Sequence, residues 1–445
     1  MPDGLIAILI LTAIFWCILL FLYFRYKHLR KRIHFKLEAE DNLSMHKPKD
    51  IIQQIAALAA EHKDVKLMRY NFVLDDYNQV AYKRLNKIRK SITGVPSDII
   101  ALIPAARWLF ENYQMMYRQI KKVRSSGTSY EVLPILKARQ YRGYPRVYIL
   151  AKKMVALSGG HLNYESISLM LKAYQKEIPL TDKEIWVLPE VIGFCLLENI
   201  IDVAEEILKV IKIKAKADRL VKEKLRLGKE ITDIAAMLCE FEPDCKDNYS
   251  FHSHVIYLLK NMSFSESDIL RYVEYHCNSG DKKLNPTHIF QEEGKTQSQL
   301  ESIIRALIIS LREINELDEE SFFGEFSSLE HILSKDPDGV YAKMDSESRG
   351  MYRGKIVKLA LKYKLSEVDI ANECLKLATD GCDGLNRPHH VGSYLVGRGY
   401  KLLKAKVLNR PMPDICRKVF NIKGMLYFTT SFIALAAFII FLAWI

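Results

Sequence analysis

Two long apolar segments, one near each end, constrain the fold of this chain more than any other feature. Residues 5–24 (LIAILILTAIFWCILLFLYF) and 424–445 carry no charged side chain. Each reaches the roughly 20 residues that an α-helix needs to cross the hydrocarbon core of a bilayer. Backbone polar groups in lipid must be satisfied within the segment, so both are predicted to be transmembrane helices. The polar sequence between them is then a domain attached to a membrane at both ends.

The flanking charges predict how that domain is oriented. Residues 1–4 hold one acid and no base, and no small-residue cleavage site follows the first apolar segment, so we expect an uncleaved anchor rather than a signal peptide. Basic residues crowd the domain side of both segments, within residues 25–32 and 401–423. The positive-inside rule therefore predicts a cytoplasmic domain with both termini outside.

The net charge of +12 is explained largely by these flanks, which anionic membrane lipid attracts. No basic face interleaved with exposed aromatic residues stands out, so we predict no nucleic-acid partner. The eight cysteines include no C-x-x-C pair, which is typical of reduced thiols in the cytosol. Neither they nor the histidines follow a common zinc spacing, and no metal site is predicted.

Helical periodicity dominates the middle of the chain. Leu109, Tyr113, Met116, Ile120 and Val123 recur at steps of four and three, and residues 185–203 repeat the pattern. Strand-like stretches are short, the best being residues 147–150 and 340–341. We therefore predict an all-α fold: a multi-helix cytoplasmic domain, divided into two subdomains, flanked by two single transmembrane helices.

The predicted boundaries follow from composition. The polar stretch 278–298, with Gly280, Pro286 and Gly294, is predicted to be a linker or mobile loop. The full expected order is an external N-terminus (1–4), a transmembrane helix (5–24), a basic juxtamembrane linker (25–39), helical subdomain 1 (40–277), the linker (278–298), helical subdomain 2 (299–410), a basic juxtamembrane segment (411–423) and a transmembrane helix (424–445).

Sequence motifs for catalysis are missing. There is no G-x-x-x-x-G-K-[ST], no G-x-G-x-x-G after a strand and no G-x-S-x-G. A sugar transferase needs carboxylates that hold a metal and a nucleotide diphosphate. The one D-x-D sequence, at residues 336–338, follows a predicted helix and is expected to form a turn. We predict no catalytic, cofactor-binding or metal-binding residue.

Several short segments, taken together, carry a family resemblance. They are PAARWLFENY (104–113), GYPRVY (143–148), AYQ (173–175), PLT and EIWVLP (within 179–189), LEN (197–199), DPDGVYAKMD (336–345), Arg349 with Tyr352 and Arg353, and HVGSYLV (390–396). In order and approximate spacing this set resembles the N-terminal region of cyclic β-1,2-glucan synthases. The resemblance covers roughly residues 100–400, and the specificity lies in the whole set.

The resemblance implies a bacterial inner-membrane protein whose relatives join a helical N-terminal region to a glucosyltransferase domain and a phosphorylase-like domain. The transferase would use UDP-glucose and a divalent metal. Because this sequence stops at Ile445 without those domains, we expect a non-catalytic region that scaffolds or docks the transferase, in cis or in trans. Two alternatives stay open: the chain is itself a glycosyltransferase, or it is a stand-alone membrane protein that binds β-1,2-glucan.

Aromatic and basic residues of these segments are the first candidates for interaction. Trp108, Tyr148 and Trp186 would stack on sugar faces, or they fill the helical core. Arg107, Arg146 and Arg349 would hold phosphate groups of UDP-glucose or lipid. The alternative for the arginines is pairing with carboxylates such as Glu111, Glu198 or Asp345.

The other candidates include His390, for which we expect helix capping or a buried hydrogen bond rather than catalysis, and Gly392, which would permit close helix packing. The remaining interaction candidates from the same segments are Asn112, Tyr113, Pro145, Gln175, Glu198, Asn199, Tyr352 and Tyr394.

Overall fold

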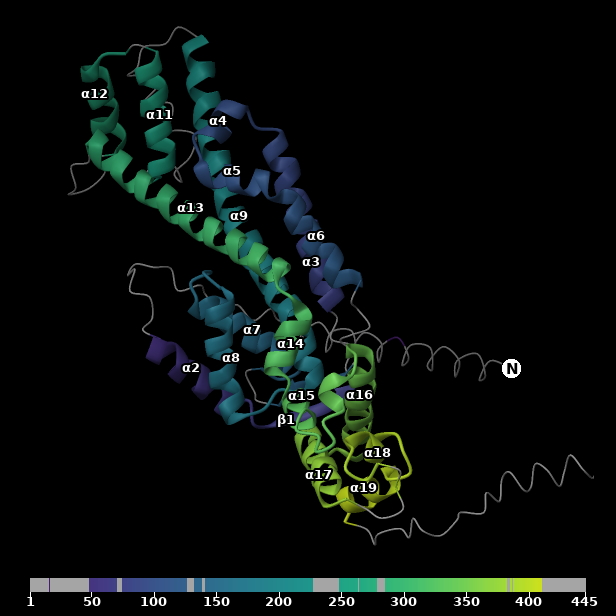
Figure 1. Ribbon diagram of the computed structural model, residues 1–445. Coiled ribbons are helices and arrows are strands. Elements are labelled where there is room, and N and C mark those ends of the chain that lie inside the picture. The colour runs from purple at the N-terminus through teal and green to yellow at the C-terminus, as the bar shows by residue number, and fades with distance from the viewer. Residues whose placement is uncertain are drawn as a thin grey trace, which may run out of the picture. The chain divides into compact units, whose positions relative to one another are not determined.

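The computed structural model describes Trp16 and residues 48–69, 74–125, 132–137, 141–226, 248–262, 264–277, 285–381, 385 and 387–409. These residues are mostly helical, as predicted, and they fall into two compact units that divide between Phe326 and Ser327 (Figure 1). The two predicted transmembrane helices (5–24 and 424–445) lie outside the described residues, except for Trp16. The two basic juxtamembrane segments (25–39 and 411–423) also lie outside them. Across the described ranges, no helix has the length and apolar character needed to span a membrane.

Unit 1 contains the following elements: α2 (Pro48–Glu61), β1 (Val65–Arg69), α3 (Leu74–Thr93), α4 (Ser97–Ala101), α5 (Pro104–Glu111), α6 (Tyr113–Ser125), β2 (Val132–Leu136), α7 (Arg146–Leu157), α8 (Tyr164–Glu177), α9 (Asp182–Arg226), α11 (Tyr249–Asn261), α12 (Glu266–Cys277), α13 (Pro286–Glu316) and α14 (Glu319–Phe326).

Helix α9 organises unit 1. Its 45 residues make it about 68 Å long at the usual rise per residue. It packs against α13, α7, α11 and α3, and Figure 1 shows α13 running beside it. Its residues 185–211 contribute to the large hydrophobic core, where Ile185, Leu188 and Ile192 are fully buried. The length of α9 therefore lets one helix serve as the wall for most of the others.

The far end of α9 belongs to a second, smaller hydrophobic core. Ala217 and Val221 pack there with Phe251 and Val255 of α11 and Tyr272 of α12. In Figure 1, α11 and α12 lie together at this end, next to the start of α13. Unit 1 thus has two hydrophobic cores, and α9 and α13 contribute residues to both.

One antiparallel strand pair interrupts the helices. β1 pairs with β2 in a register that sets Val65 opposite Leu136 and Arg69 opposite Val132. Residues 147–150, expected to be strand-like, lie instead inside α7, where nearly every side chain is buried. A helix buried on all sides has no polar face to reveal its period, so a short apolar run within it looks like a buried strand.

Four of the five residues predicted to form a stripe over 109–123 are buried and Tyr113 is half-buried, but two helices carry the stripe. Leu109 lies on α5, and Met116, Ile120 and Val123 lie on α6; all four are at most 5% exposed. Asn112 separates the helices, and its side-chain amide donates to the Trp108 carbonyl at 2.9 Å. Asparagine commonly ends helices by such local hydrogen bonds, and this break was not predicted.

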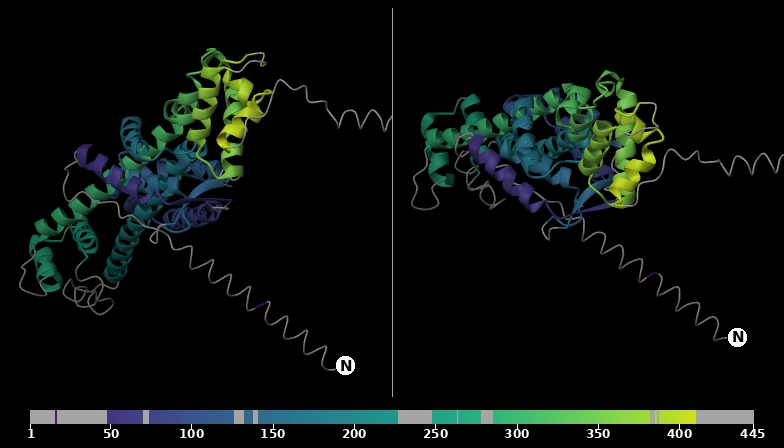
Figure 2. Two further views of the ribbon diagram at one scale, coloured as in Figure 1. Left: turned by 90° about the horizontal axis from the view of Figure 1, so that it is seen from below. Right: turned by 60° about the horizontal axis from the view of Figure 1, so that its bottom comes forward.

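Unit 2 is a bundle of short helices: α15 (Ser328–Leu333), the 3₁₀ turn η3 (Tyr341–Lys343), α16 (Ser346–Tyr363), α17 (Glu367–Asp380), α18 (Val391–Leu395) and α19 (Tyr400–Val407). Figure 2 shows these yellow-green helices packed together. Helix α17 contacts α15, α16, α18 and α19 and lies at the centre of the bundle. Residues 340–341, expected to be strand-like, lie at the start of η3.

The division between units lies later in the chain than the composition suggested. Residues 286–298 of the predicted linker form the start of α13, and residues 278–284 lie outside the described part of the chain. Pro286 is the first helical residue, where a missing N–H costs nothing, and Asn285 caps the helix by accepting from the His288 amide at 2.7 Å. Polar composition here marks a solvent-facing helix start.

Candidate functional site: two buried polar clusters

Some segments of the family resemblance supply residues to buried polar clusters in unit 1 and in unit 2, whereas the segment 104–113 does not. In unit 1 the central interaction joins Arg146, at the start of α7, to Glu184, in the first turn of α9. The Arg146 guanidinium donates to the Glu184 carboxylate through Nε at 2.9 Å and through Nη2 at 2.5 Å. Both side chains are at most 4% exposed. This two-point geometry suits the planar fork of arginine.

The Glu184 carboxylate is also part of a helix cap. It accepts from the Thr181 backbone amide at 2.9 Å and from the Thr181 hydroxyl at 3.0 Å, while Thr181 Oγ1 accepts from the Glu184 amide. Thr181-x-x-Glu184 is thus a capping box that starts α9. Arg146 also donates to the Pro179 carbonyl, so the loop before α9 is tied to α7. Glu184 therefore fixes the start of α9, the loop that precedes α9, and the start of α7.

A second buried carboxylate of unit 1 belongs to Glu198, 14 residues after Glu184 on α9. It accepts from the Tyr148 hydroxyl at 3.0 Å and pairs with the Lys152 ammonium at 3.0 Å. Tyr148 is 1% exposed, and burial, reinforced by the Glu198 charge, raises its pKa well above the ordinary value. This phenol therefore stays protonated and acts as a hydrogen-bond donor, not as a base.

His62, the residue after α2, lies near Arg146 and Tyr174. It is fully buried, and its Nδ1 lies 2.7 Å from the Tyr174 hydroxyl. Burial, together with the positive charge of Arg146, lowers the pKa of His62 to about 4, whereas burial raises that of Tyr174. At neutral pH both groups are uncharged, so the charges in this region are those of the ion pairs.

In unit 2, Asp336 is the organising residue. Its carboxylate is buried and accepts from three donors: His390 Nδ1 at 2.7 Å, the Val391 amide at 3.0 Å and the Tyr341 amide at 3.2 Å. It therefore ties the turn after α15 to η3 and to the start of α18. The expected turn is present, and its first aspartate holds it in place while Asp338 is exposed.

Glu330 of α15 forms the second half of the unit 2 cluster. Its carboxylate accepts from Arg349 at 2.5 Å, from the Tyr341 hydroxyl at 2.9 Å and from Arg353. Burial, followed by the Glu330 charge, raises the pKa of Tyr341. Ser327 caps α15 by accepting from the Glu330 amide at 3.1 Å, which places Glu330 at the third helical position.

His390 also contacts Tyr352, whose hydroxyl lies 3.3 Å from His390 Nε2. Gly392 is buried against both of these side chains, and a Cβ at this position would collide with them. The Tyr394 hydroxyl donates to the Pro388 carbonyl at 2.8 Å. The HVGSYLV segment is therefore fixed by its own polar groups, and Gly392 permits the close approach.

The other candidates are dispersed. Asn112 accepts from Arg312 at 3.1 Å, the Tyr113 hydroxyl donates to Asn86 at 3.0 Å, and Trp108 packs half-buried against the large core. Arg107 is exposed, and within the described residues it forms no ion pair with Glu111 or any other carboxylate.

Four further candidates lie along α7, α8 and α9. Pro145 is buried at the residue before α7 and bridges to Ile135. Gln175 donates to the Phe326 carbonyl at 3.2 Å, and Asn199 donates to the Cys195 carbonyl at 2.8 Å. Trp186 is 49% exposed and packs edge-on against Phe323.

The arginine partners were not identified from the sequence. Arg146 pairs with Glu184 and not Glu198, and Arg349 pairs with Glu330 and not Asp345. Both true partners lie three residues after a threonine or serine cap, and that T/S-x-x-E pattern is a signal that could have identified them. In the described parts of the chain, no group of three His, Cys, Asp or Glu side chains is arranged to hold a metal.

Comparison with known proteins gives a relative of known activity. The chain is 26% identical over 316 residues to the cyclic beta-(1,2)-glucan synthase NdvB of Rhizobium meliloti (strain 1021). The match covers 69% of this chain and 11% of NdvB, in the N-terminal region of that larger enzyme, which confirms the resemblance seen in the sequence. No profile of a known protein family matches the chain.

Proposed function

We propose that this chain is a membrane-anchored, non-catalytic region of a cyclic β-1,2-glucan synthase, which scaffolds the glucosyltransferase that polymerises glucose from UDP-glucose. The similarity to NdvB over 316 residues supports the assignment to this class of enzyme. Because the matched part is 11% of NdvB, the transfer reaction, its divalent metal and the phosphorylase-like step are assigned to other domains, in cis or in trans.

The scaffold role is supported by the contacts of the polar residues in the segments that resemble the synthases: these residues bind one another. Arg146 with Glu184, Tyr148 with Glu198, and Asp336 with His390 bind one another inside the fold. Each interaction joins one helix or loop to another. Side chains committed in this way stabilise a fixed surface for a partner, which is what a docking region requires.

Membrane attachment is part of the same proposal. The apolar segments 5–24 and 424–445 and their basic flanks support a two-pass protein of the bacterial cytoplasmic membrane, with the helical domain in the cytoplasm and both termini outside. Anchoring at both ends would hold the domain at the membrane face where a nascent glucan chain would be exported.

The test is to purify the affinity-tagged full chain from its native membranes in a nonionic detergent. We expect a glucosyltransferase to co-purify, so that the eluate incorporates labelled glucose from UDP-glucose into β-1,2-glucan. A tagged, unrelated two-pass membrane protein is the control. Eluates without transferase activity, at a yield that recovers the chain quantitatively, would contradict the scaffold role.

The catalytic alternative is separated by a second assay on the chain stripped of partners by high salt. With UDP-glucose and Mg²⁺ or Mn²⁺, we expect no release of UDP above the rate without protein. Turnover that persists through further purification would show that the chain itself transfers glucose.

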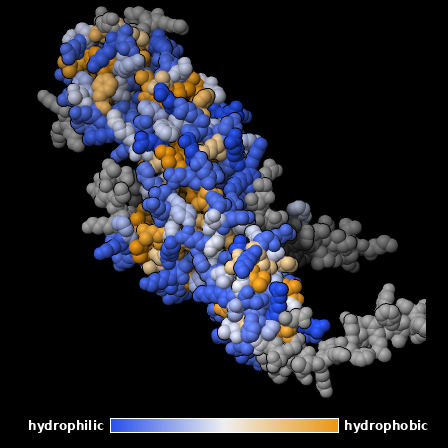
Figure 3. Space-filling view, in the orientation of Figure 1, coloured by the Kyte–Doolittle hydropathy of each residue, from blue (hydrophilic) through white to orange (hydrophobic). Residues whose placement is uncertain are grey.

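A second candidate function, binding of β-1,2-glucan, is favoured by the surface around α14. Tyr164 is 44% exposed and lines a cavity of about 330 Å³ together with Glu313, Glu316 and Asp318. Aromatic faces can stack on sugar rings, and carboxylates accept hydrogen bonds from hydroxyls. The side of the molecule shown in Figure 3 is largely hydrophilic, and its hydrophobic residues form separate groups. A single exposed aromatic residue that stacks on a sugar ring is consistent with such a surface.

Titration with β-1,2-glucan oligomers, followed by tryptophan fluorescence, tests this candidate because Trp186 is 49% exposed and packs against Phe323 of α14. We expect a saturable change that Tyr164→Ala weakens. Tyr257→Ala, at a residue of similar exposure on α11, is the matched control. An unchanged spectrum at millimolar glucan would exclude binding at this surface.

A further inference from the structure

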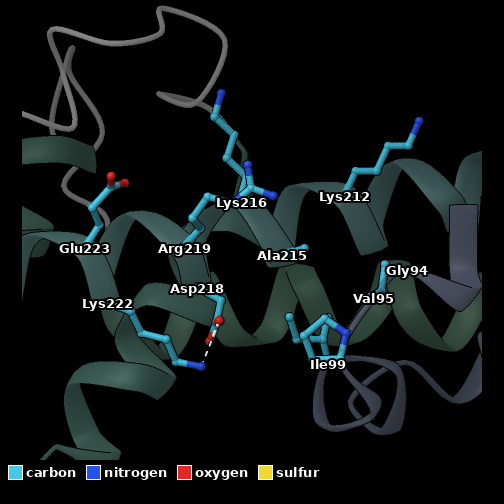
Figure 4. A pocket seen from close by; sticks show the side chains of 11 residues that line it. Gly94, Val95, Ile99, Lys212, Ala215, Lys216, Asp218, Arg219, Lys222 and Glu223 are labelled. Atoms are coloured by element: carbon cyan, nitrogen blue, oxygen red, sulfur yellow. Dashed lines mark ion pairs between the residues drawn. The ribbon is translucent and has the colours of Figure 1, made fainter.

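A basic pocket lies along α9, and none of its lining residues belongs to either polar cluster. It has a volume of about 760 Å³ and is lined on one side by α9 residues 212–223 and on the other by residues 94–99, the turn between α3 and α4 together with the start of α4. Figure 4 shows Gly94, Val95 and Ile99 across from the helix. Nothing in the scaffold function proposed above requires such a pocket.

Cations dominate the charged side chains of the pocket. Lys212, Lys216, Arg219 and Lys222 line it with only two acids, Asp218 and Glu223, so it carries a net excess of two positive charges. The Lys222 ammonium pairs with Asp218 at 2.9 Å. In Figure 4 the ends of Lys212, Lys216 and Arg219 extend from the same side of α9, and Val95 and Ile99 lie at the other side of the helix.

Two of these cations are available to a ligand. Lys212 and Arg219 are exposed, and neither forms an ion pair within the part of the chain that the structure describes. They lie seven residues apart, two helical turns, so their charges reach the same stripe of α9. Two unpaired cations beside a third, at Lys216, create a local field that attracts anions.

The opposite wall has a different character. Val95, Pro96 and Ile99 supply apolar surface, and Ala215 adds to it from α9. Ile99 is only 2% exposed, so this wall is continuous with the interior of unit 1. A pocket with cations on one side and apolar side chains on the other suits a ligand that joins an anionic group to an uncharged, partly apolar one.

We propose that this pocket binds a phosphate-bearing ligand, with the phosphate against Lys212, Lys216 and Arg219 and the attached organic group against Val95, Pro96 and Ile99. Arginine presents a planar fork that matches two phosphate oxygens, and lysine adds mobile point charges. The phosphate belongs either to a soluble compound or to a phospholipid headgroup, and the same side chains would hold both.

The experiment is calorimetric titration of the full chain in a nonionic detergent at about 0.15 M salt, where charges beyond about 8 Å are largely screened. One arm uses inorganic pyrophosphate. The other uses dihexanoyl phosphatidylglycerol, with zwitterionic dihexanoyl phosphatidylcholine as its blank. We expect saturable binding in at least one arm, and the arm that binds identifies the source of the phosphate.

The pocket variant is Lys212→Glu/Arg219→Glu, for which we expect about a tenfold or greater loss of affinity, because two charged contacts are reversed. The matched control is Arg305→Glu/Lys358→Glu, which makes the same change of charge at two exposed helical residues outside the pocket. Lys212→Gln/Arg219→Gln, which introduces no repulsion, should show a smaller loss in the same direction.

Circular dichroism melting curves confirm that each variant folds, since all four sites are exposed. The absence of saturable binding in both arms would overturn the proposal. An equal loss of affinity in the pocket and control variants would also overturn it, because the interaction would then follow overall charge rather than the pocket. These results are independent of the co-purification test, which measures a protein partner.

Discussion

The two units use a glutamate at the same position of a helix start, yet they surround it differently. Glu184 lies three residues after Thr181, and Glu330 lies three residues after Ser327. Glu184 is fully buried with one arginine, Arg146. Glu330 accepts from two arginines whose side chains are 33% and 12% exposed.

The difference concerns what remains when one partner is removed. In unit 1 the loss of either partner leaves an uncompensated charge inside the large hydrophobic core, where water cannot reach it. In unit 2 a second arginine and nearby solvent remain, and solvent screens exposed pairs strongly. The same T/S-x-x-E pattern therefore forms an ion pair in each unit, but removing one partner should cost more stability in unit 1 than in unit 2.

The largest effect is expected from breaking the unit 1 pair. Glu184→Leu or Arg146→Met alone should lower the free energy of unfolding by about 3–5 kcal/mol, because a buried charge is left unpaired. The double variant should recover most of this loss, since no charge remains. Urea unfolding followed by tryptophan fluorescence measures it, in a Trp16→Phe/Trp444→Phe background that leaves only Trp108 and Trp186, both in unit 1. Single variants that cost less than about 1 kcal/mol would remove the contrast between the units.

A comparable test in unit 2 uses its D-x-D sequence. Asp336→Ala should cost about 3 kcal/mol, because three buried donors lose their acceptor at once. Asp338→Ala, two residues away and exposed, is the control and should change stability by less than about 0.5 kcal/mol. Hydrogen exchange of the peptides covering η3 and α18 reports on this unit. Equal exchange in the two variants would show that Asp336 does not organise the loop.

The pH dependence sharpens the description of unit 1. The pKa of His62 is about 4 in the folded chain and about 6.5 when unfolded. Between these values the unfolded state binds more protons, so stability is lost as pH falls, by about 2 kcal/mol from pH 7 to pH 5. His62→Gln, which keeps an amide for Tyr174, should remove that part of the slope. The measurement is the urea midpoint by tryptophan fluorescence at both pH values. If stability changed with pH by the same amount in the variant, His62 would not be the group responsible for this pH dependence.

The general fold was predictable because periodicity is a local property. The apolar steps over residues 109–123 identify a buried stripe, and Leu109 and Met116 are indeed buried. The strand pair was missed because β1 and β2 are five residues each and lie more than sixty residues apart in the chain. The break at Asn112 depends on one side-chain hydrogen bond, which the periodicity of its apolar neighbours does not reveal.

The polar clusters show more clearly what could not be predicted from the sequence. Carboxylate partners for Arg146 and Arg349 were expected from the residue types, but the partners proposed were taken from other quoted segments. The true ones lie 38 and 19 residues away, in each case at the start of another helix. His390 was expected to make a buried hydrogen bond, and its acceptor, Asp336, lies 54 residues away. Which residues pair across such distances in the chain depends on how the helices pack. The packing of helices cannot be deduced from the pattern of residues in a single sequence.

The smallest effect is the one that separates the two arginines of unit 2. Arg349 is the more exposed, and Arg353 also lies 3.4 Å from the Tyr341 hydroxyl. We therefore expect Arg349→Gln to cost less than about 1 kcal/mol, as exposed pairs do. Arg353→Gln should cost about 2 kcal/mol, since a charged, largely buried hydrogen bond is lost.

Hydrogen exchange of the α15 and α16 peptides measures both variants, with wild-type exchange as the reference. The predicted order is the informative quantity, because the two arginines share one carboxylate and differ mainly in their access to water. If Arg349→Gln were the more damaging variant, exposure would not decide how much a shared carboxylate contributes. The contrast with the fully buried Arg146–Glu184 pair would then need another physical cause.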